Sequence, residues 1–262
     1  MIGAGAGIHP SAAVDPSARI GVGVSVGPFA VIGAEVEIGD GCAIGPHVVI
    51  EGPTTLGRNN RVHAFAALGG EPQDKKYADQ PTRLVIGDGN TIREFVSINR
   101  GTVEDNSITQ LGDDNWIMAY VHIAHDCIVG NHTIFANAAS LAGHCRVEDY
   151  AILGGFSLIH QFCQIGTHAF TAMGSVINRD VPPFVTVAGT YAEPHGINSE
   201  GLKRRGYDSK RIMAIKRAYR TLYKSGLSLA EARAQLAQAA TETPDIQQMI
   251  DFIDRSQRSL IR

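Results

Sequence analysis

The aliphatic residues of this chain follow a period of six over most of its length. The aliphatic positions are Ile8, Val14, Ile20, Val26, Ile32, Ile38, Ile44, Ile50, Leu56, Val62, Leu68, Ile86, Ile92 and Ile98, and then, one residue out of phase, Leu111 and every sixth residue to Ile177 except Thr171. Glycine, another small residue or an acidic residue often comes next, as in IGD, IGP and LGG. Six is not a helical period, but it suits short flat strands joined by tight turns, with three strands in a coil of about 18 residues.

This repeat predicts a parallel β-helix as the main domain. The aliphatic residue would point into the coil, and the glycine-rich step would turn the corner. The pattern resembles the hexapeptide-repeat family of left-handed parallel β-helices, whose coils form a three-sided prism, and the resemblance covers roughly residues 2–187. Proteins of this family are usually trimers with sites between neighbouring prisms, so the resemblance implies a homotrimer.

The hexad pattern ends near residue 190, and helical signals follow it. We therefore predict a mainly β chain, with a left-handed parallel β-helix domain at 1–190 and a small α-helical C-terminal domain at 191–262. The expected helix signals are a cap at Ser209 for a helix that runs to Lys224, a capping box of Ser228 and Glu231, and Pro244 in the first turn of a third helix.

Composition narrows the class of protein further. The 29 glycines fit many tight turns, and the 23 Lys and Arg against 26 Asp and Glu leave a formal charge of −3, which gives no global attraction to nucleic acid or membranes. No apolar run reaches the roughly 18 residues of a membrane helix, and the opening MIGAGAGIHP lacks the features of a signal peptide. We expect a cytoplasmic protein without stable membrane insertion.

The cysteines follow the same coil period. Cys127, Cys145 and Cys163 are eighteen residues apart, each four residues after an aliphatic position, and Cys42 holds the same place after Ile38. This position is the second inward slot of the coil. We predict a ladder of buried thiols rather than disulfides or metal ligands, as expected in a reducing compartment.

The histidines, by contrast, gather on the outside. His144 lies 19 residues after His125, and His160 lies 16 residues after His144, so the three fall on successive coils near one corner. His122 lies across the same turn as His125. With Asp126 and Gln161 these side chains should form one outward-facing patch, and a purely structural scaffold would have no reason to gather them.

Two chemistries compete for this patch. A zinc-dependent hydratase resembling the gamma-class carbonic anhydrases would use three histidines, with ligands about 36 residues apart. Thirty-six residues after His125 stands Gln161, and the same step from His122 reaches Leu158, so the spacing argues against this alternative. In acyl transfer, a single neutral histidine would take a proton from an acceptor hydroxyl as it attacks a thioester.

Further motifs favour acyl transfer. The chain contains EPQDKKYADQPTR, NRGT, HIAHDC, LAGH, IHQFC, DVPP and GLKRRG, in this order. In order and spacing they resemble the family of UDP-N-acetylglucosamine O-acyltransferases that begin lipid A synthesis. The resemblance covers essentially the whole chain. One departure is Asn99, which stands where some relatives have histidine in an HRGT motif.

The resemblance implies a role for each site residue. His125 would be the general base and Asp126 would orient its ring, while the N–H of Gly143 would donate to the oxyanion. The sugar 3-hydroxyl of UDP-N-acetylglucosamine would attack a 3-hydroxyacyl thioester on acyl carrier protein, without metal or cofactor. The remaining assignments are Gln73, Asp74, Lys76 and His122 for the sugar, His144, His160 and Gln161 for the cleft, and Asn198, Glu200, Arg204 and Arg205 for the nucleotide.

Positive charge is concentrated at the start of the helical domain. Residues 201–224 contain nine lysines and arginines against Asp208 alone. Such a segment could steer the acidic acyl carrier protein, or it could simply be a solvated helix face. No aromatic stacking pattern accompanies the charges, which argues against nucleic acid.

The coil period also suggests how the acyl chain is measured. Stepping back by eighteen from Met173 reaches Gly155, Asn137 and Ala119, so a column of small or short residues ends at a bulky one. The family resemblance associates this position with acyl-chain length. From His125 to Met173 is about 2.7 coils, or roughly 13 Å, which accommodates on the order of ten carbons. The alternative is that Met173 only packs between subunits.

Overall fold

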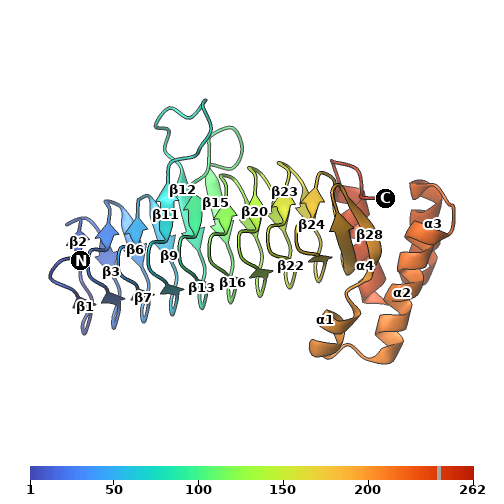
Figure 1. Ribbon diagram of the computed structural model, residues 1–262, viewed down its shortest axis with the longest axis horizontal. Helices are drawn as coiled ribbons and strands as arrows, with labels where there is room; N and C mark the ends of the chain where they lie inside the picture. The colour runs from blue at the N-terminus through green and yellow to red at the C-terminus, as the bar shows by residue number, and fades with distance from the viewer. Residues whose placement is uncertain (241–242) are drawn as a thin grey trace.

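The computed structural model describes residues 1–240 and 243–262. It is an elongated prism that begins at the N-terminus and ends against a group of helices (Figure 1). Three parallel sheets form the sides of the prism, with 11, 9 and 8 strands. Apart from the last two strands of the first sheet, strands three apart in the chain are neighbours in each sheet, which confirms the predicted coil.

The first sheet contains β1 (Gly7–Ile8), β4 (Ser25–Val26), β7 (Ala43–Ile44), β10 (Arg61–Val62), β13 (Thr91–Ile92), β16 (Trp116–Ile117), β19 (Ile134–Phe135), β22 (Ile152–Leu153), β25 (Phe170–Thr171), β27 (Val185–Gly189) and β28 (Ala192–Ile197). The second contains β2 (Ala13–Val14), β5 (Val31–Ile32), β8 (Val49–Ile50), β11 (Ala67–Gly70), β14 (Ser97–Asn99), β17 (His122–Ile123), β20 (Ser140–Leu141), β23 (Leu158–Ile159) and β26 (Val176–Ile177). The third contains β3 (Arg19–Ile20), β6 (Val36–Ile38), β9 (Thr54–Leu56), β12 (Arg83–Ile86), β15 (Ile108–Leu111), β18 (Ile128–Val129), β21 (Arg146–Val147) and β24 (Gln164–Ile165).

The three edges of the prism carry the turns. We call the edge between the first and second sheets the first corner, that between the second and third sheets the second corner, and that from the third sheet to the next coil the third corner. Both insertions leave the prism at the second corner, one of them between β11 and β12 and the other between β14 and β15 (Figure 1). The interruptions of the hexad pattern thus project over one edge.

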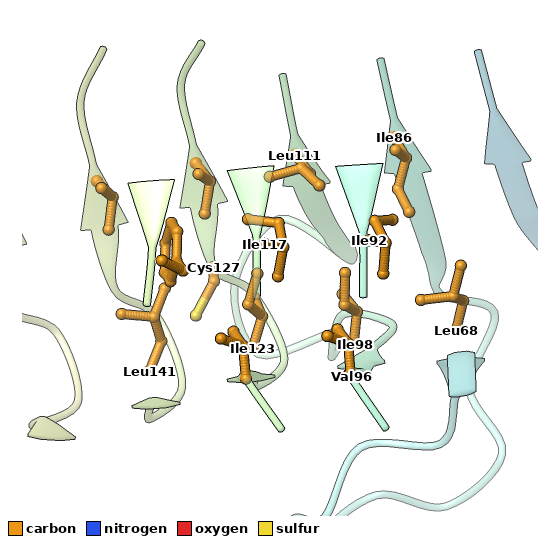
Figure 2. Packing of buried hydrophobic residues seen from close by; sticks show 14 of the residues in the cluster. Leu68, Ile86, Ile92, Val96, Ile98, Leu111, Ile117, Ile123, Cys127 and Leu141 are labelled. Atoms are coloured by element: carbon orange, nitrogen blue, oxygen red, sulfur yellow. The ribbon is translucent and has the colours of Figure 1, made fainter. Parts of the chain in front are cut away.

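The core is the stack of inward-facing hexad residues. Their side chains point from all three sheets toward the prism axis, as Figure 2 shows for Ile92, Leu111 and Leu141. Each is fully buried, and burial of such a side chain stabilises the fold by about 1.5–3 kcal/mol. Cys127, also in this view, is buried and unpaired like the other three cysteines, so the predicted thiol ladder is confirmed.

Four helices follow the prism: α1 (Ser199–Arg204), α2 (Ser209–Lys224), α3 (Leu229–Ala240) and α4 (Pro244–Arg255). The predicted Ser228–Glu231 box caps α3, and Pro244 opens α4. The predicted cap at Ser209 is wrong by one residue, because the side chain of Asp208 accepts the Arg211 N–H at 2.8 Å. The short α1 and the antiparallel pair β27–β28 were not expected from the sequence.

The helices pack on the last coil through their own apolar cluster, which includes Phe184, Ile215 and Phe252. The boundary expected at residue 190 falls between β27 and β28, and it stays a prediction. Within the part of the chain that is described, no helix is long and apolar enough to cross a membrane.

Candidate active site

The second corner gathers the residues that carry chemistry. His125 follows β17, His144 follows β20 and His160 follows β23, so the three occupy the same turn in successive coils. The two insertions leave the prism at this corner, beside these turns. Because turns stack in register along a parallel β-helix, side chains about 18 residues apart in sequence become neighbours.

His125 and Asp126 form a closely held pair. The Nδ1 atom of His125 lies 2.8 Å from Oδ2 of Asp126, whose residue is only 2% exposed. Thr102 donates its backbone N–H to Oδ1 at 2.9 Å and its hydroxyl to Oδ2 at 2.6 Å. Burial alone would raise the pKa of Asp126, but hydrogen bonds from His125 and Thr102 hold it below its usual value. The carboxylate is therefore ionised at neutral pH.

His144 packs against the pair. Its ring meets that of His125 edge-on at 5.0 Å and stacks on Phe162 at 4.4 Å. Its Nδ1 atom lies 3.1 Å from Oδ2 of Asp105 and 3.8 Å from Oδ2 of Asp126. Two carboxylates near the same ring nitrogen thus favour one orientation of this imidazole.

His122 lies on β17, directly before the turn that carries His125 and Asp126. Its Nδ1 lies 2.8 Å from the Ser97 hydroxyl on the preceding coil. Burial, and then the nearby charge of His125, lower the pKa of His122. This ring is therefore neutral at physiological pH and can act as a hydrogen-bonding group.

Gly143 is required by the closeness of His125. A Cβ atom at this position would lie 2.6 Å from Cε1 of His125 and 2.8 Å from Nε2. Any side chain would push the imidazole away. Among the described residues no acceptor takes the Gly143 N–H, so this donor is available beside the ring.

The same cluster could be considered as a metal site. Ligand atoms of His125, Asp126 and His144 lie within 4.8 Å of one another, the only such group in residues 1–240 and 243–262. However, three donors already occupy the oxygens of Asp126, two from Thr102 and one from His125. This donor arrangement favours a hydrogen-bonded base over a metal ligand.

The first insertion brings its predicted sugar-binding residues to this corner. The backbone N–H of Lys76 donates to the half-buried Asp74 at 3.0 Å, and its Nζ lies 3.3 Å from Glu104 of the second insertion. The two insertions enclose a cavity of about 70 Å³ lined by Asp74, Lys76, Tyr77, Gln80, Thr102, Val103 and Glu104. Gln73 is exposed at the loop surface.

His160 and Gln161 lie at the same corner, one coil beyond His144. Both are exposed, and the described contact of the His160 ring is with the Gln161 carbonyl at 3.2 Å. The structure therefore brings His122, His125 and His144 together, while His160 lies at the edge of this group.

The residues expected to bind the nucleotide lie elsewhere in the chain. Asn198 caps α1 and donates to the carbonyl of His168 at the third corner, at 3.1 Å. The Arg205 guanidinium lies over the Tyr150 ring at 4.6 Å, also at the third corner. In α1, Glu200 pairs with Lys203 and Arg204 is exposed. Within one chain this group and His125 occupy different corners of the prism.

Met173 lies at the remaining, first corner and is 82% exposed. Backbone hydrogen bonds from Ala138 to Ala119, from Phe156 to Asn137 and from Gly174 to Gly155 link the successive turns. The column that the coil period predicts, Ala119, Asn137, Gly155 and Met173, is therefore in register.

Three residues that touch the site were not expected from the sequence: Thr102, Asp105 and Ser97. Thr102 and Asp105 lie in or beside the second insertion, where stepping by eighteen residues no longer finds a neighbour. Ser97 could have been found, because it lies opposite His122 in register across the sheet.

Comparison with known proteins identifies relatives over the whole chain. A family profile described as UDP N-acetylglucosamine O-acyltransferase, domain 2, matches residues 180–261, and a profile for bacterial transferase hexapeptide repeats matches residues 35–70 and 108–143. The acyl-[acyl-carrier-protein]–UDP-N-acetylglucosamine O-acyltransferase of Halorhodospira halophila is 62% identical over 255 residues, covering 97% of this chain and 99% of that protein. The protein of the same name from Thiobacillus denitrificans is 55% identical with the same coverage.

Solved structures give the same result. The UDP-N-acetylglucosamine acyltransferase of Francisella novicida has a TM-score of 0.95 at 40% identity, covering 97% of this chain and 94% of its own. The Arabidopsis enzyme of that name has a TM-score of 0.83 at 38% identity, covering 97% and 100%.

Proposed function

This chain belongs to the acyl-[acyl-carrier-protein]–UDP-N-acetylglucosamine O-acyltransferase family, and we propose that His125 is the general base of its reaction. As a member, it transfers an acyl group from acyl carrier protein to UDP-N-acetylglucosamine in lipid A synthesis. The observation that carries the choice of base is the 2.8 Å contact between Nδ1 of His125 and the fixed Asp126, which leaves Nε2 free to accept a proton.

The chemistry of the step follows from this geometry. The sugar 3-hydroxyl loses its proton to Nε2 of His125 while its oxygen forms a bond to the thioester carbonyl carbon. The C–S bond then breaks, and the departing thiolate of the carrier takes the proton from the imidazolium. Asp126 stabilises the imidazolium between the two transfers, and the Gly143 N–H supports the developing oxyanion.

The surrounding residues are assigned to the two substrates. We place the sugar against Asp74, Lys76, Gln73 and His122, and the edge of the cleft at His144, His160 and Gln161. The cavity between the two insertions supports this placement, because Asp74 and Lys76 line it together with Thr102. The nucleotide is assigned to Asn198, Glu200, Arg204 and Arg205.

We propose that the chain works as a homotrimer, and the separation of these groups supports assembly with other copies. Within one prism the nucleotide residues lie at the third corner and the base lies at the second, so we infer that a neighbouring copy supplies the nucleotide residues. The first corner also suits a contact between copies, because stacked rings form an exposed ridge there: Phe29, His47, Phe65, Phe95 and Tyr120. Phe29 and Tyr120 are 59% and 61% exposed, and such apolar ridges favour contact with another protein surface.

The preferred acyl group is proposed to be a 3-hydroxyacyl chain near ten carbons. The bulky Met173 ends a column of small or short residues, and the axial rise from His125 to Met173 is roughly 13 Å. The exposure of Met173 in the single chain leaves its side chain available to such a groove.

We also expect the enzyme to work in the cytoplasm. All four cysteines are unpaired and buried. Unpaired thiols are typical of proteins that function in reducing compartments.

The direct test supplies UDP-N-acetylglucosamine with 3-hydroxyacyl carrier proteins of several chain lengths and identifies the product by mass spectrometry. The expected product is the 3-O-acylated sugar nucleotide, formed best from a donor near ten carbons. If the chain instead showed hydratase activity that requires added zinc and is lost with a chelator, the hydratase alternative would be supported.

A further inference from the structure

The second insertion, residues 100–107, lies over the proposed catalytic pair, yet the reaction described above assigns it no task. It leaves the prism after β14 and returns at β15, which places it at the second corner. Three of its side chains reach other parts of the site: Thr102, Glu104 and Asp105.

Thr102 holds both oxygens of Asp126. Its N–H reaches Oδ1 at 2.9 Å and its hydroxyl reaches Oδ2 at 2.6 Å, while Thr102 itself is only 4% exposed. The backbone N–H of Asp126 itself donates to the Thr109 hydroxyl at 2.8 Å. An aspartate fixed at both oxygens can present only one of them to Nδ1 of His125.

Two other residues of the insertion link the pair to its surroundings. Asp105 meets Nδ1 of His144 at 3.1 Å, and His144 in turn lies edge-on against His125 at 5.0 Å. Glu104 meets Lys76 of the first insertion at 3.3 Å. The insertion thus contacts Asp126 beside His125, the ring of His144, and Lys76 in the loop assigned to the sugar.

We propose that residues 100–107 form a clamp that orients the base, with Thr102 as a positioning residue that acts on His125 through Asp126. The proposal rests on His125 being the base. We assign Thr102 to Asp126, which it holds through its N–H and its hydroxyl, and not to the reacting atoms. Its removal would let the Asp126 carboxylate rotate away from the imidazole. Since the loss falls on proton transfer rather than binding, turnover should suffer more than substrate affinity.

The test uses steady-state kinetics of four variants in the full-length protein. Thr102→Val keeps the side-chain shape and removes the hydroxyl donor, so kcat should fall about 10- to 100-fold while KM for UDP-N-acetylglucosamine changes less than about threefold. Thr102→Ser restores the donor and should stay within about threefold of wild type. Asn106→Ala, an exposed residue of the same insertion, is the matched control and should be unaffected.

Asp105→Asn gives a second route, because this residue is exposed and lies outside the aliphatic core. It should lower kcat about 3- to 10-fold through His144. A direct readout is the Nδ1 proton resonance of His125, assigned by its loss in His125→Ala. In Thr102→Val this resonance should shift or broaden, whereas in Thr102→Ser it should persist.

Three results would overturn the clamp proposal. They are an unchanged kcat in folded Thr102→Val, a kcat that falls as far in Thr102→Ser as in Thr102→Val, and a His125 Nδ1 resonance that Thr102→Val leaves unaltered. These results remain distinct from failure of the proposed function. If His125→Ala were as active as wild type, the base assignment itself would be wrong; if that variant were inactive while Thr102→Val was normal, only the clamp would be wrong.

Discussion

At the scale of single residues, the position of the His125 ring is fixed by its neighbours Asp126 and Gly143. Asp126 is buried and cannot turn to water, and Gly143 has no side chain to displace the imidazole. Because Nδ1 of His125 is committed to the carboxylate, Nε2 is the nitrogen that remains for the acceptor hydroxyl. The contact with Asp126 thus fixes the tautomer and the direction of this imidazole, as the proposed role of a base requires.

Replacement of the base tests this argument. His125→Ala should lower kcat by about 100-fold or more, since general bases typically contribute 10²–10⁴-fold. The fold should persist, because the residue lies outside the aliphatic core. The matched control is His63→Ala, which removes a histidine paired with Glu94 at 3.5 Å away from the site. Near-normal turnover of His125→Ala would remove this residue from the mechanism.

A second histidine should control stability rather than catalysis. His168 is 6% exposed and stacks between Tyr150 and Phe184, and burial, followed by the charge of Arg205, lowers its pKa to about 4. The unfolded chain would bind this proton near pH 6.5. Stability is therefore fully present above about pH 6.5 and is lost as the pH falls toward 4, by up to about 3 kcal/mol.

The measurement is the unfolding midpoint of wild type and His168→Phe at several pH values. Phenylalanine keeps the stacking but binds no proton, so its midpoint should fall less between about pH 6.5 and 4. Parallel curves for the two proteins would contradict the assignment of this pH dependence to His168.

At the scale of elements, each coil is stabilised by repeated polar contacts as well as by its core. At the third corner, the Asn60 side chain accepts the Asn90 N–H and the Asn90 side chain accepts the Asn115 N–H, both at 2.8 Å. These buried side chains satisfy turn amides that the short strands leave unpaired. The ladder continues across the first insertion, which explains why the prism is not broken there.

The sequence predicted the coils well because the hexad reports each inward side chain directly. It predicted the turns that carry His125 and His144 for the same reason. It could not place Thr102 or Asp105 against these residues, because an insertion of irregular length has no period from which to count. The β27–β28 pair and α1 were missed because elements this short carry too little periodic signal.

The helix α2 carries a charge pattern that the structure refines. Arg211 forms a two-point pair with the buried Asp245, at 3.0 and 2.8 Å, and lies over the Tyr207 ring. This arginine is structural. By contrast, Lys216 and Arg220 are exposed one turn apart and have no ion-pair partner among the residues described. They are the better candidates for meeting an acidic carrier protein.

Reversal of these two charges should slow the encounter with acyl carrier protein. Lys216→Glu with Arg220→Glu should lower kcat/KM for the acyl donor about tenfold at low salt, and rising salt should reduce the difference from wild type. The control reverses Arg58 and Arg61, two exposed arginines on the N-terminal coils. Equal effects of the two double variants, or no dependence on salt, would leave α2 as a solvated surface.

At the scale of the whole molecule, the prism separates three tasks among its corners. The second corner holds the proposed base, the third holds the residues assigned to the nucleotide, and the first holds Met173. A single chain cannot bring these groups together, but adjacent prisms can place different corners across one cleft. The regular rise per coil then fixes how far along the axis each group lies from the others.

This regular rise makes acyl-chain length a testable property of the prism. About 2.7 coils separate His125 from Met173, roughly 13 Å along the axis, which matches on the order of ten extended carbons. Met173→Gly should open the end of the column and shift preference toward about fourteen carbons, since each newly buried methylene is worth about 0.8 kcal/mol. The measurement is kcat/KM for a series of 3-hydroxyacyl carrier proteins.

A bulky side chain placed in the same column nearer to His125 should shorten the preferred acyl chain. Gly155→Met should shorten the preferred chain, because residue 155 stands one coil nearer His125 and a Cβ atom there would meet only the carbonyl oxygen of Asn137, at 3.3 Å. One coil is about 4.8 Å, so the preference should fall by about three to four carbons. If both variants keep the wild-type profile, the chain is measured elsewhere; if Met173→Gly alone changes it, the groove ends at residue 173 but does not pass residue 155.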